Sequence, residues 1–403
     1  MALRLADRKL GMIAALDAVI EDPREADQVV HRQRDLLSQR IYGLALGYED
    51  LNDHDTLRKD LLWQSAVERG EQLASSPTLC RLEQRADRQS AWAMSKVLVE
   101  LFIQSFRQAP RELILDFDAT DDRVHGKQEG RAFHGYYDDW CFLPLYVFCG
   151  EQLLVSYLRP SNQDPARHAW AVLKLLVTRL RQEWPEVKII FRGDSGFCRW
   201  RMLRWCEKSG VDYVVGLAKN TRLLALLEKP MEQAAAAFAE TQEKQRHFVR
   251  LEYAAQSWDR PRTVIAKAEH TAKGANPRFI LTSLEGHEQK IYDDIYCARG
   301  EMENRIKEQQ LGLFADRTSC QGWWANQFRL LLSSAAYVLM EYMRRTALAG
   351  TELARAQVTT IRLKLLKIGT VILRNTRRIR LLFSSAYPHQ QLFATMLGRL
   401  SSA

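Results

Sequence analysis

Two aspartates end an apolar run at residues 113–118, a pattern typical of a buried β-strand. Because side chains alternate along a strand, Asp116 and Asp118 share one face of the sheet. A carboxylate at the end of a buried strand is costly unless it is paired or binds a metal ion. The pattern fits a metal ligand, and it also fits an acidic turn, since Asp121 and Asp122 follow directly.

A further aspartate, Asp194, follows the apolar run at residues 187–191, with glycines nearby at Gly193 and Gly196. Glycines there allow a sharp backbone turn and leave room for a ligand to approach. A plain Gly-Asp-Ser-Gly turn would look the same when it is taken by itself. The position of Asp194 relative to Asp118 therefore decides between the two interpretations.

A glutamate on an expected helix completes the set. At about 100° per residue with Tyr296 at zero, Arg299 lies at about 300°, Glu303 at about 340° and Lys307 at about 20°. Gln310, at about 320°, extends the same stripe. An ordinary solvent-facing helix would show this periodicity too, but a cation on each side of Glu303 favours a site for metal and phosphate together.

Three carboxylates on three elements suit one kind of chemistry. Two divalent ions about 3.5–4 Å apart can activate an attacking oxygen and stabilise a leaving oxygen at phosphorus. Mg²⁺, or Mn²⁺ in its place, prefers oxygen ligands, so histidine and cysteine are not needed. We therefore predict that Asp118, Asp194 and Glu303 are catalytic residues and ligands of two such ions. Asp116 is the alternative first acid, and Arg299 and Lys307 are expected to contact phosphate.

A sheet and a helix must bring these residues together. Strands are expected at residues 113–118, 141–149 and 153–158, followed by a helix at 167–183, a strand at 187–191, a helix at 199–208 and a strand at 213–217. Short links suit an antiparallel meander, and helix-linked strands suit parallel crossovers. The order predicts a mixed α/β, ribonuclease-H-like core in which the first and fourth strands are neighbours. Asp118 and Asp194 would then lie side by side.

Five segments are expected along the chain. They are a helical N-terminal region at residues 1–108, the first part of the core at 109–223, a β-rich insertion at 224–292, the second part of the core with the glutamate helix at 293–350, and a basic C-terminal region at 351–403.

The basic C-terminal region carries the net charge. The chain has 58 Lys and Arg against 49 Asp and Glu, a formal charge of +9, and no acidic residue follows Glu352. Residues 359–366 and 370–382 alternate apolar and basic side chains around a possible turn at Asn375-Thr376, which predicts a basic hairpin facing phosphates. A solvated tail is the alternative. The candidate nucleic-acid contacts are Arg374, Arg377 and Arg378.

The seven cysteines form no C-x-x-C pair and are odd in number, so neither a zinc knuckle nor a disulfide framework is indicated. Reduced thiols in a cytoplasmic protein are expected. The longest apolar stretch, residues 330–340, spans 11 residues, so no signal peptide or membrane span is predicted.

Several motifs together resemble the DDE transposases of bacterial insertion sequences, and specifically the family typified by insertion sequence 1380. These motifs are IYGLALGYED at residues 41–50, NDHD at 52–55, SPTL at 76–79, LDFDATDD at 115–122, HGKQ at 125–128, RGDSGF at 192–197 and DYVVGL at 212–217. The wider group has a Tyr-x2-Arg-x3-Glu-x6-Lys signature, whose first three positions match Tyr296, Arg299 and Glu303. Gln310 stands at the lysine position, and Lys307 is the cation one turn earlier. The family's Asp-x-Thr pattern favours Asp118 over Asp116.

The resemblance implies metal-dependent cleavage at the element's terminal inverted repeats and strand transfer into target DNA. It also implies double-stranded DNA as the partner, a homodimer on DNA, a DNA-binding N-terminal region, and a place at the bacterial nucleoid away from membranes. Tyr296 would position the DNA backbone. Relatives often begin with additional residues, so Met1 is a candidate internal start.

Two other functions fit the same residues. A catalytically inactive or repurposed transposase would bind DNA without cutting it, and a simple ribonuclease-H-fold nuclease would cut without joining. Trp258, Trp323 and Trp324 could stack on an unpaired base, although a place in the core is the simpler interpretation.

Overall fold

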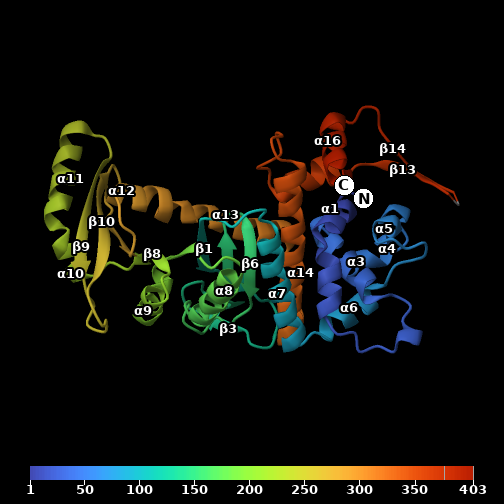
Figure 1. The fold of residues 1–403 in the computed structure, drawn as a ribbon, viewed down its shortest axis with the longest axis horizontal. Coiled ribbons are helices and arrows are strands. Elements are labelled where there is room, and N and C mark those ends of the chain that lie inside the picture. The colour runs from blue at the N-terminus through green and yellow to red at the C-terminus, as the bar shows by residue number, and fades with distance from the viewer. Residues whose placement is uncertain (376, 403) are drawn as a thin grey trace.

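The computed structural model describes residues 1–375 and 377–402. An N-terminal group of helices, a central sheet and an outer β-rich part follow one another along the long axis of the molecule (Figure 1). None of the described helices is long and apolar enough to cross a bilayer. All seven cysteines are free.

The N-terminal part is helical, as expected. Its helices are α1 (Ala2–Leu10), α2 (Met12–Val19), η1 (Ala26–Gln28), α3 (Gln33–Ala45), α4 (Asp53–Leu57), α5 (Leu61–Ala66), α6 (Ser76–Gln84) and α7 (Arg88–Gln104). Helices α6 and α7 are separate, because Asp87 caps the start of a new helix. The Asp87 carboxylate accepts a hydrogen bond from the backbone N–H of Ser90, and the Ser90 hydroxyl accepts one from the backbone N–H of Asp87.

Five strands of the central sheet position the candidate site. They are β1 (Glu112–Ala119), β5 (Leu145–Cys149), β6 (Gln152–Tyr157), β7 (Lys188–Gly193) and β8 (Asp212–Leu217), in the spatial order β6-β5-β1-β7-β8. Strand β5 pairs antiparallel with β1 and β6, whereas β7 pairs parallel with β1 and β8. The predicted meander and parallel crossovers are therefore confirmed. Helices α8 (Ala169–Glu183) and α9 (Trp200–Lys208) link β6, β7 and β8 and pack their apolar sides on the sheet.

The run expected as one strand at residues 141–149 is two strands. Strand β4 (Asp139–Phe142) lies in a separate small sheet between β2 (Asp122–Arg123) and β3 (Ala132–His134). Pro144 separates β4 from β5, and it has no backbone N–H to donate to a sheet.

The outer β-rich part contains α10 (Thr221–Leu226), α11 (Glu228–Thr241), β9 (Gln245–Tyr253), β10 (Arg262–Thr271), β11 (Gly274–Ala275) and β12 (Arg278–Thr282). Strand β12 pairs antiparallel with β8, so these strands extend the central sheet to nine strands. Strands thus occupy much of the segment at residues 224–292 that was predicted to be rich in β-structure.

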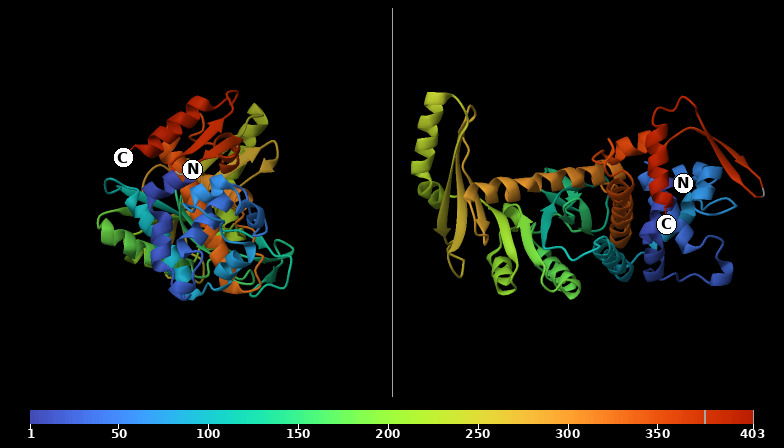
Figure 2. Two further views of the ribbon diagram at one scale, coloured as in Figure 1. Left: turned by 90° about the vertical axis from the view of Figure 1, so that its right-hand side faces the viewer. Right: turned by 45° about the horizontal axis from the view of Figure 1, so that its top comes forward.

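The helix that carries Glu303 runs without interruption from residue 288 to residue 312. Its sections are α12 (Glu288–Lys290), η3 (Ile291–Tyr296), η4 (Cys297–Arg299), α13 (Gly300–Lys307) and η5 (Glu308–Gly312), of which η3 and η5 are π-helical. It forms a long rod along the central sheet (Figure 2, right). The next helix, α14 (Trp323–Tyr342), continues into η6 (Met343–Ala347) and packs against α3, α7 and β6.

The C-terminal part begins with a helical turn, not a strand. Residues 359–366, expected to be extended, lie in α15 (Val358–Ile361) and η7 (Arg362–Leu366), because Val358, Ile361 and Leu365 recur at helical spacing and are buried. Strands β13 (Thr370–Arg374) and β14 (Ile379–Phe383) form the expected hairpin, which projects from the body (Figures 1 and 2). Thr376 of the expected turn lies outside the described residues, and α16 (Gln390–Ser401) follows.

Candidate active site

Asp118 and Asp194 lie side by side at the ends of neighbouring strands. Phe117 of β1 is paired in parallel register with Gly193 of β7, and each aspartate follows its paired residue directly. Asp194 also caps a short turn, because its carboxylate accepts a hydrogen bond from the backbone N–H of Gly196 at 2.8 Å. The neighbouring strands thus bring together two carboxylates that are distant in sequence.

The carboxylate of Asp116 belongs to a buried ion pair. The guanidinium of Arg192 donates two hydrogen bonds to it, and its remaining terminal nitrogen donates to the carbonyl of Ile295. Both side chains are buried. Asp116 therefore ties β1 to β7 and to the helix before Glu303, whereas Asp118 has no such bidentate partner. Sequence reasoning missed Arg192, although its place beside Gly193 at the end of an apolar strand marks it as an unusual cation.

Arg299 joins the first aspartate to the glutamate. Its guanidinium lies 3.4 Å from Asp118 Oδ2 and donates a 2.8 Å hydrogen bond to Glu303 Oε1. The Glu303 side chain is 45% exposed and that of Asp118 is 14% exposed, so the site opens on the glutamate side. The guanidinium stands where these two carboxylates converge.

The electrostatics of Asp118 reflect this crowding. The pKa of Asp118 is raised to about 7, chiefly by burial and also by the carboxylates of Asp194 and Glu303, while Arg299 opposes the rise. Within residues 1–375 and 377–402, no three His, Cys, Asp or Glu side chains are close enough together to hold a metal ion as they stand. The donors nevertheless fit a hard divalent cation, because all three are carboxylates and two of them already share one positive group.

Tyr296 packs against the turn that holds Asp194. Its hydroxyl and the backbone N–H of Ser195 would each lie 2.7 Å from a Cβ atom added at Gly216 of β8. Only glycine allows this close approach. Gly216 belongs to the DYVVGL motif, but its role in seating Asp194 and Tyr296 was not predicted from the sequence.

The remaining residues of the helical stripe have different surroundings. The side-chain amide of Gln310 donates to the carbonyl of Asp121 at 2.9 Å, which links the glutamate helix to the segment after β1. Lys307 is exposed and makes no ion pair within the described part of the chain. Glu308 is buried against Arg344 and Arg305, away from this stripe.

The predicted basic contacts of the tail lie on the projecting hairpin. Arg374, Arg377 and Arg378 are exposed, and Arg374 also reaches the carbonyl of Gly70 at 3.4 Å. Arg362, by contrast, is buried and donates a 2.9 Å hydrogen bond to the carbonyl of Ala45. Part of the basic tail thus fastens the C-terminal region to the N-terminal helices.

The three tryptophans considered for base stacking have partners within the protein. Trp323 packs edge-on against Phe142 and closely over Gly130, and Trp258 packs edge-on against Tyr253. Trp324 lies partly buried against the core.

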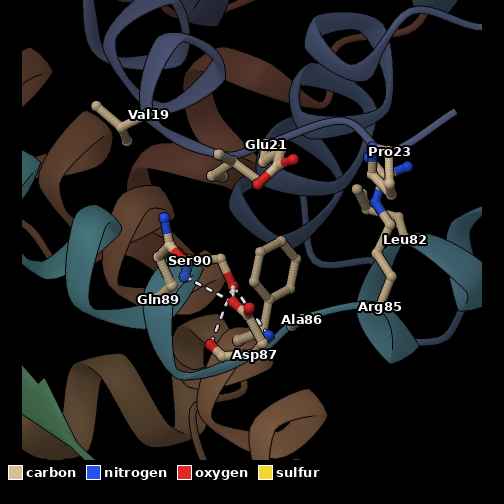
Figure 3. Close-up of a pocket in the computed structure, with 11 residues that line it drawn as sticks. Val19, Glu21, Pro23, Leu82, Arg85, Ala86, Asp87, Gln89 and Ser90 are labelled. Carbon is tan, nitrogen blue, oxygen red and sulfur yellow. Dashed lines mark hydrogen bonds between the residues drawn. The ribbon is translucent and has the colours of Figure 1, made fainter.

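A separate pocket of about 210 Å³ lies between α2, α6 and α7, away from the carboxylates. Figure 3 shows Asp87 and Ser90 hydrogen-bonded to each other at its edge. These polar groups already complete the N-terminal cap of α7, so we assign no chemistry to this pocket.

Asp122, for which the sequence left an acidic turn open as one interpretation, is buried. The hydroxyl of Thr318 donates to its Oδ2 at 2.9 Å, while Oδ1 has no partner among the described residues. Burial raises its pKa to about 8. The folded protein therefore holds a proton between about pH 4 and pH 8 that the unfolded chain has released, and stability falls as pH rises through this window.

Replacing Asp122 by asparagine should remove this contribution, because the amide cannot ionise yet can still accept from Thr318. As the pH is raised from 5 to 8, we expect the unfolding free energy of the parent protein to fall more than that of Asp122→Asn. Urea denaturation at three pH values in this range measures the difference. Parallel pH profiles of the two proteins would show that Asp122 is ionised in the fold.

Taken together, the fold is a mixed α/β architecture in which Asp118 and Asp194 end two neighbouring parallel strands and Arg299 links Asp118 to Glu303 on the adjacent helix. The chain belongs to the family described as transposase DDE domain group 1, whose sequence model matches residues 1–403. It is therefore a transposase.

Two further comparisons add little. The search of curated proteins found no match. Among solved structures, the cryo-EM structure of the piggyBac transposase synaptic complex with hairpin DNA is similar, with 10% identity and a TM-score of 0.46, covering 100% of this chain and 81% of that one. That likeness is too remote to bear on the roles of residues.

Proposed function

We propose that this transposase cuts DNA at the terminal inverted repeats of an insertion sequence and joins the freed ends to target DNA. The observation that carries the proposal is that Arg299 joins Asp118 to Glu303, while Asp194 ends the strand beside that of Asp118. The motifs further favour a member of the group typified by insertion sequence 1380. In this proposal residues 109–223 and 293–350 form a ribonuclease-H-like core, residues 224–292 an insertion, residues 1–108 a DNA-binding region and residues 351–403 a basic region.

The three carboxylates would hold two Mg²⁺ or Mn²⁺ ions, since DDE transposases generally use divalent metal ions. Such ions, when bound, activate the attacking oxygen and stabilise the leaving oxygen of an in-line displacement. Asp118 and Asp194 supply oxygens from neighbouring strands, and Glu303 closes the set from its helix. Hydrolysis at the element end would free a 3′-hydroxyl, and transesterification would then join that hydroxyl to the target strand.

Arg299 has a second role in this proposal. Once Asp118 and Glu303 are neutralised by another cation, its guanidinium is free to bind a phosphate oxygen of the DNA. Lys307 lies exposed two helical turns further along, where it can contact the backbone. Tyr296 keeps the Asp194 turn in place through its contact at Gly216 and faces the same site.

The projecting hairpin would hold DNA outside the active site. Arg374, Arg377 and Arg378 are exposed on or beside its strands, so they can reach phosphates without moving from the fold. A homodimer on DNA would bring two element ends together for joining.

The test is a joining assay with the purified chain. A labelled element end and a supercoiled plasmid are incubated with the protein and Mg²⁺, and joined product is resolved on a gel. We expect joined product with Mg²⁺ and none with EDTA. End binding without any cleavage would overturn the proposal in favour of a DNA-binding protein, and cleavage without joining would favour a nuclease.

A further inference from the structure

Arg159 is a buried cation that holds backbone carbonyls and no carboxylate. It belongs to the loop between β6 and α8, residues 158–168, and is 2% exposed. Among the residues that the structure describes, its guanidinium donates to the carbonyls of Leu143 at 3.0 Å, Pro165 at 2.8 Å and Arg167 at 2.7 Å. Burial lowers its pKa to about 10. A cation buried without a carboxylate is unfavourable, so Arg159 contributes through the backbone that it holds in place.

These bonds fasten the β6–α8 loop at both of its ends. Leu143 lies between β4 and β5, and its backbone N–H donates to the carbonyl of Arg159 at 2.8 Å, so the two residues are bonded in each direction. The same guanidinium reaches Pro165 and Arg167 just before α8 begins. One side chain therefore sets the path of the whole loop.

The far end of the loop lies against the Asp194 turn, residues 194–198. The Cβ atom of Pro165 would lie 3.5 Å from a Cβ atom added at Gly196, which is ordinary van der Waals contact. The carboxylate of Asp164 accepts hydrogen bonds from the guanidinium of Arg199 at 2.8 and 3.0 Å. Arg199 directly follows the turn, so the loop contacts the turn in its middle and at its end.

The turn in its place orients the carboxylate of Asp194. Its Oδ1 accepts the 2.8 Å hydrogen bond from the backbone N–H of Gly196, whereas its Oδ2 accepts none from the described part of the chain. A Cβ atom at Gly196 would lie 3.0 Å from that Oδ1, so loop, turn and carboxylate are packed closely together. The charge of Asp194 also raises the pKa of Asp118, in keeping with their adjacent strand ends. One oxygen of Asp194 is thus held and the other is free.

We propose that Arg159 is a positioning residue of the active site, which holds the β6–α8 loop against the Asp194 turn and so fixes the free oxygen of Asp194 for a divalent cation. The inference rests on the proposed function. A ligand that is already oriented need not be ordered when the cation binds. Residues that orient a ligand from behind typically change metal affinity roughly 10- to 100-fold when they are replaced.

The first measurement is hydrogen exchange in the metal-free protein, followed by mass spectrometry on peptides that span residues 194–198. Arg159→Met removes the donors and keeps an unbranched apolar side chain. We expect the amides of the Asp194 turn to exchange roughly tenfold faster in this variant, because the loop no longer restrains the turn.

The second measurement is a titration with Mn²⁺ alone, in which electron paramagnetic resonance reports the free ion. Arg159→Met should bind Mn²⁺ roughly tenfold more weakly than the parent protein. Arg159→Lys keeps a charged donor for the carbonyls and should recover most of the affinity. Pro165→Gly removes the contact with Gly196 at a partly exposed position, so it should weaken Mn²⁺ binding even if Arg159→Met does not fold.

Arg40→Met is the matched control. Arg40 is also fully buried, but it pairs with Glu83 among the N-terminal helices. The variant should be less stable than the parent protein, yet at a temperature where circular dichroism shows it folded it should match the parent in both measurements.

Equal exchange of the turn in Arg159→Met and Arg40→Met would overturn the proposal. Mn²⁺ binding that is unchanged in Arg159→Met would also overturn it, and would leave Arg159 with a role in stability alone. A parent protein that binds no Mn²⁺ would contradict both this role and the proposed function, so the failure of the inference by itself is distinguishable from that of the function.

Discussion

Asp118→Asn should abolish DNA joining without lowering stability. An amide cannot replace a carboxylate as a ligand of a divalent cation, and losing about 4 kcal/mol of transition-state stabilisation would slow joining roughly a thousandfold. Burial of the Asp118 carboxylate is unfavourable to its charged form, as its raised pKa shows, so the neutral amide does not weaken the metal-free fold. Asp194→Asn should lose joining to a similar extent.

Asp116→Asn is the matched comparison, since it lies on the same face of the same strand. It removes the negative charge that faces the buried guanidinium of Arg192, and breaking such a pair costs about 3 kcal/mol. We expect a clear loss of stability in urea denaturation, with joining retained at low temperature. The opposite result, joining lost with Asp116→Asn at full stability and kept with Asp118→Asn, would make Asp116 the first acid.

Arg344→Met should destabilise the fold by about 3–5 kcal/mol, because it leaves the buried carboxylate of Glu308 without its main partner. The Arg344 and Glu308 side chains are 1% and 2% exposed, and their shortest contact is 2.8 Å. Glu308 also accepts a 2.7 Å hydrogen bond from the backbone N–H of Val358. One carboxylate thus joins the glutamate helix to η6 and to the C-terminal part, and urea denaturation measures its loss.

Two further variants make the result specific. The double variant Glu308→Gln with Arg344→Met removes both charges and should recover much of the stability. Arg179→Met breaks a pair with Glu100 of similar length, 2.6 Å, whose side chains are 31% and 41% exposed, and it should cost less than about 1 kcal/mol. Equal losses for Arg344→Met and Arg179→Met would contradict the importance of the buried pair.

Much of the central sheet could be predicted from the sequence because it depends on local signals. These signals are alternating apolar runs, glycine turns and helical periodicity, each of which lies within a short stretch of sequence. They predicted the positions of strands β1, β6, β7 and β8 and of helices α8 and α9. The lengths of the links indicated which strands run antiparallel and which parallel. The ribonuclease-H-like order then predicted that Asp118 and Asp194 end neighbouring strands, as their register shows.

Local signals were ambiguous where two structures share one pattern. Residues 359–366 alternate apolar and basic side chains, but Val358 and Ile361 are buried and the segment is helical because a core lies beneath it. The run at 141–149 is apolar throughout, yet its two halves belong to different sheets. In both cases the deciding contacts come from residues distant in the chain.

By itself the sequence determined the kinds of side chain available for chemistry and their places on strand ends and on one helical stripe. The tertiary structure decided which charges meet. It pairs the carboxylate of Asp116 with Arg192 and places that of Asp118 beside Arg299. It buries Glu308 and leaves Lys307 exposed. It packs Trp323 against Phe142 and leaves Trp140 exposed. The reason is physical: the free energy of a charge or an aromatic ring depends on what surrounds it, and those surroundings are brought together only by folding.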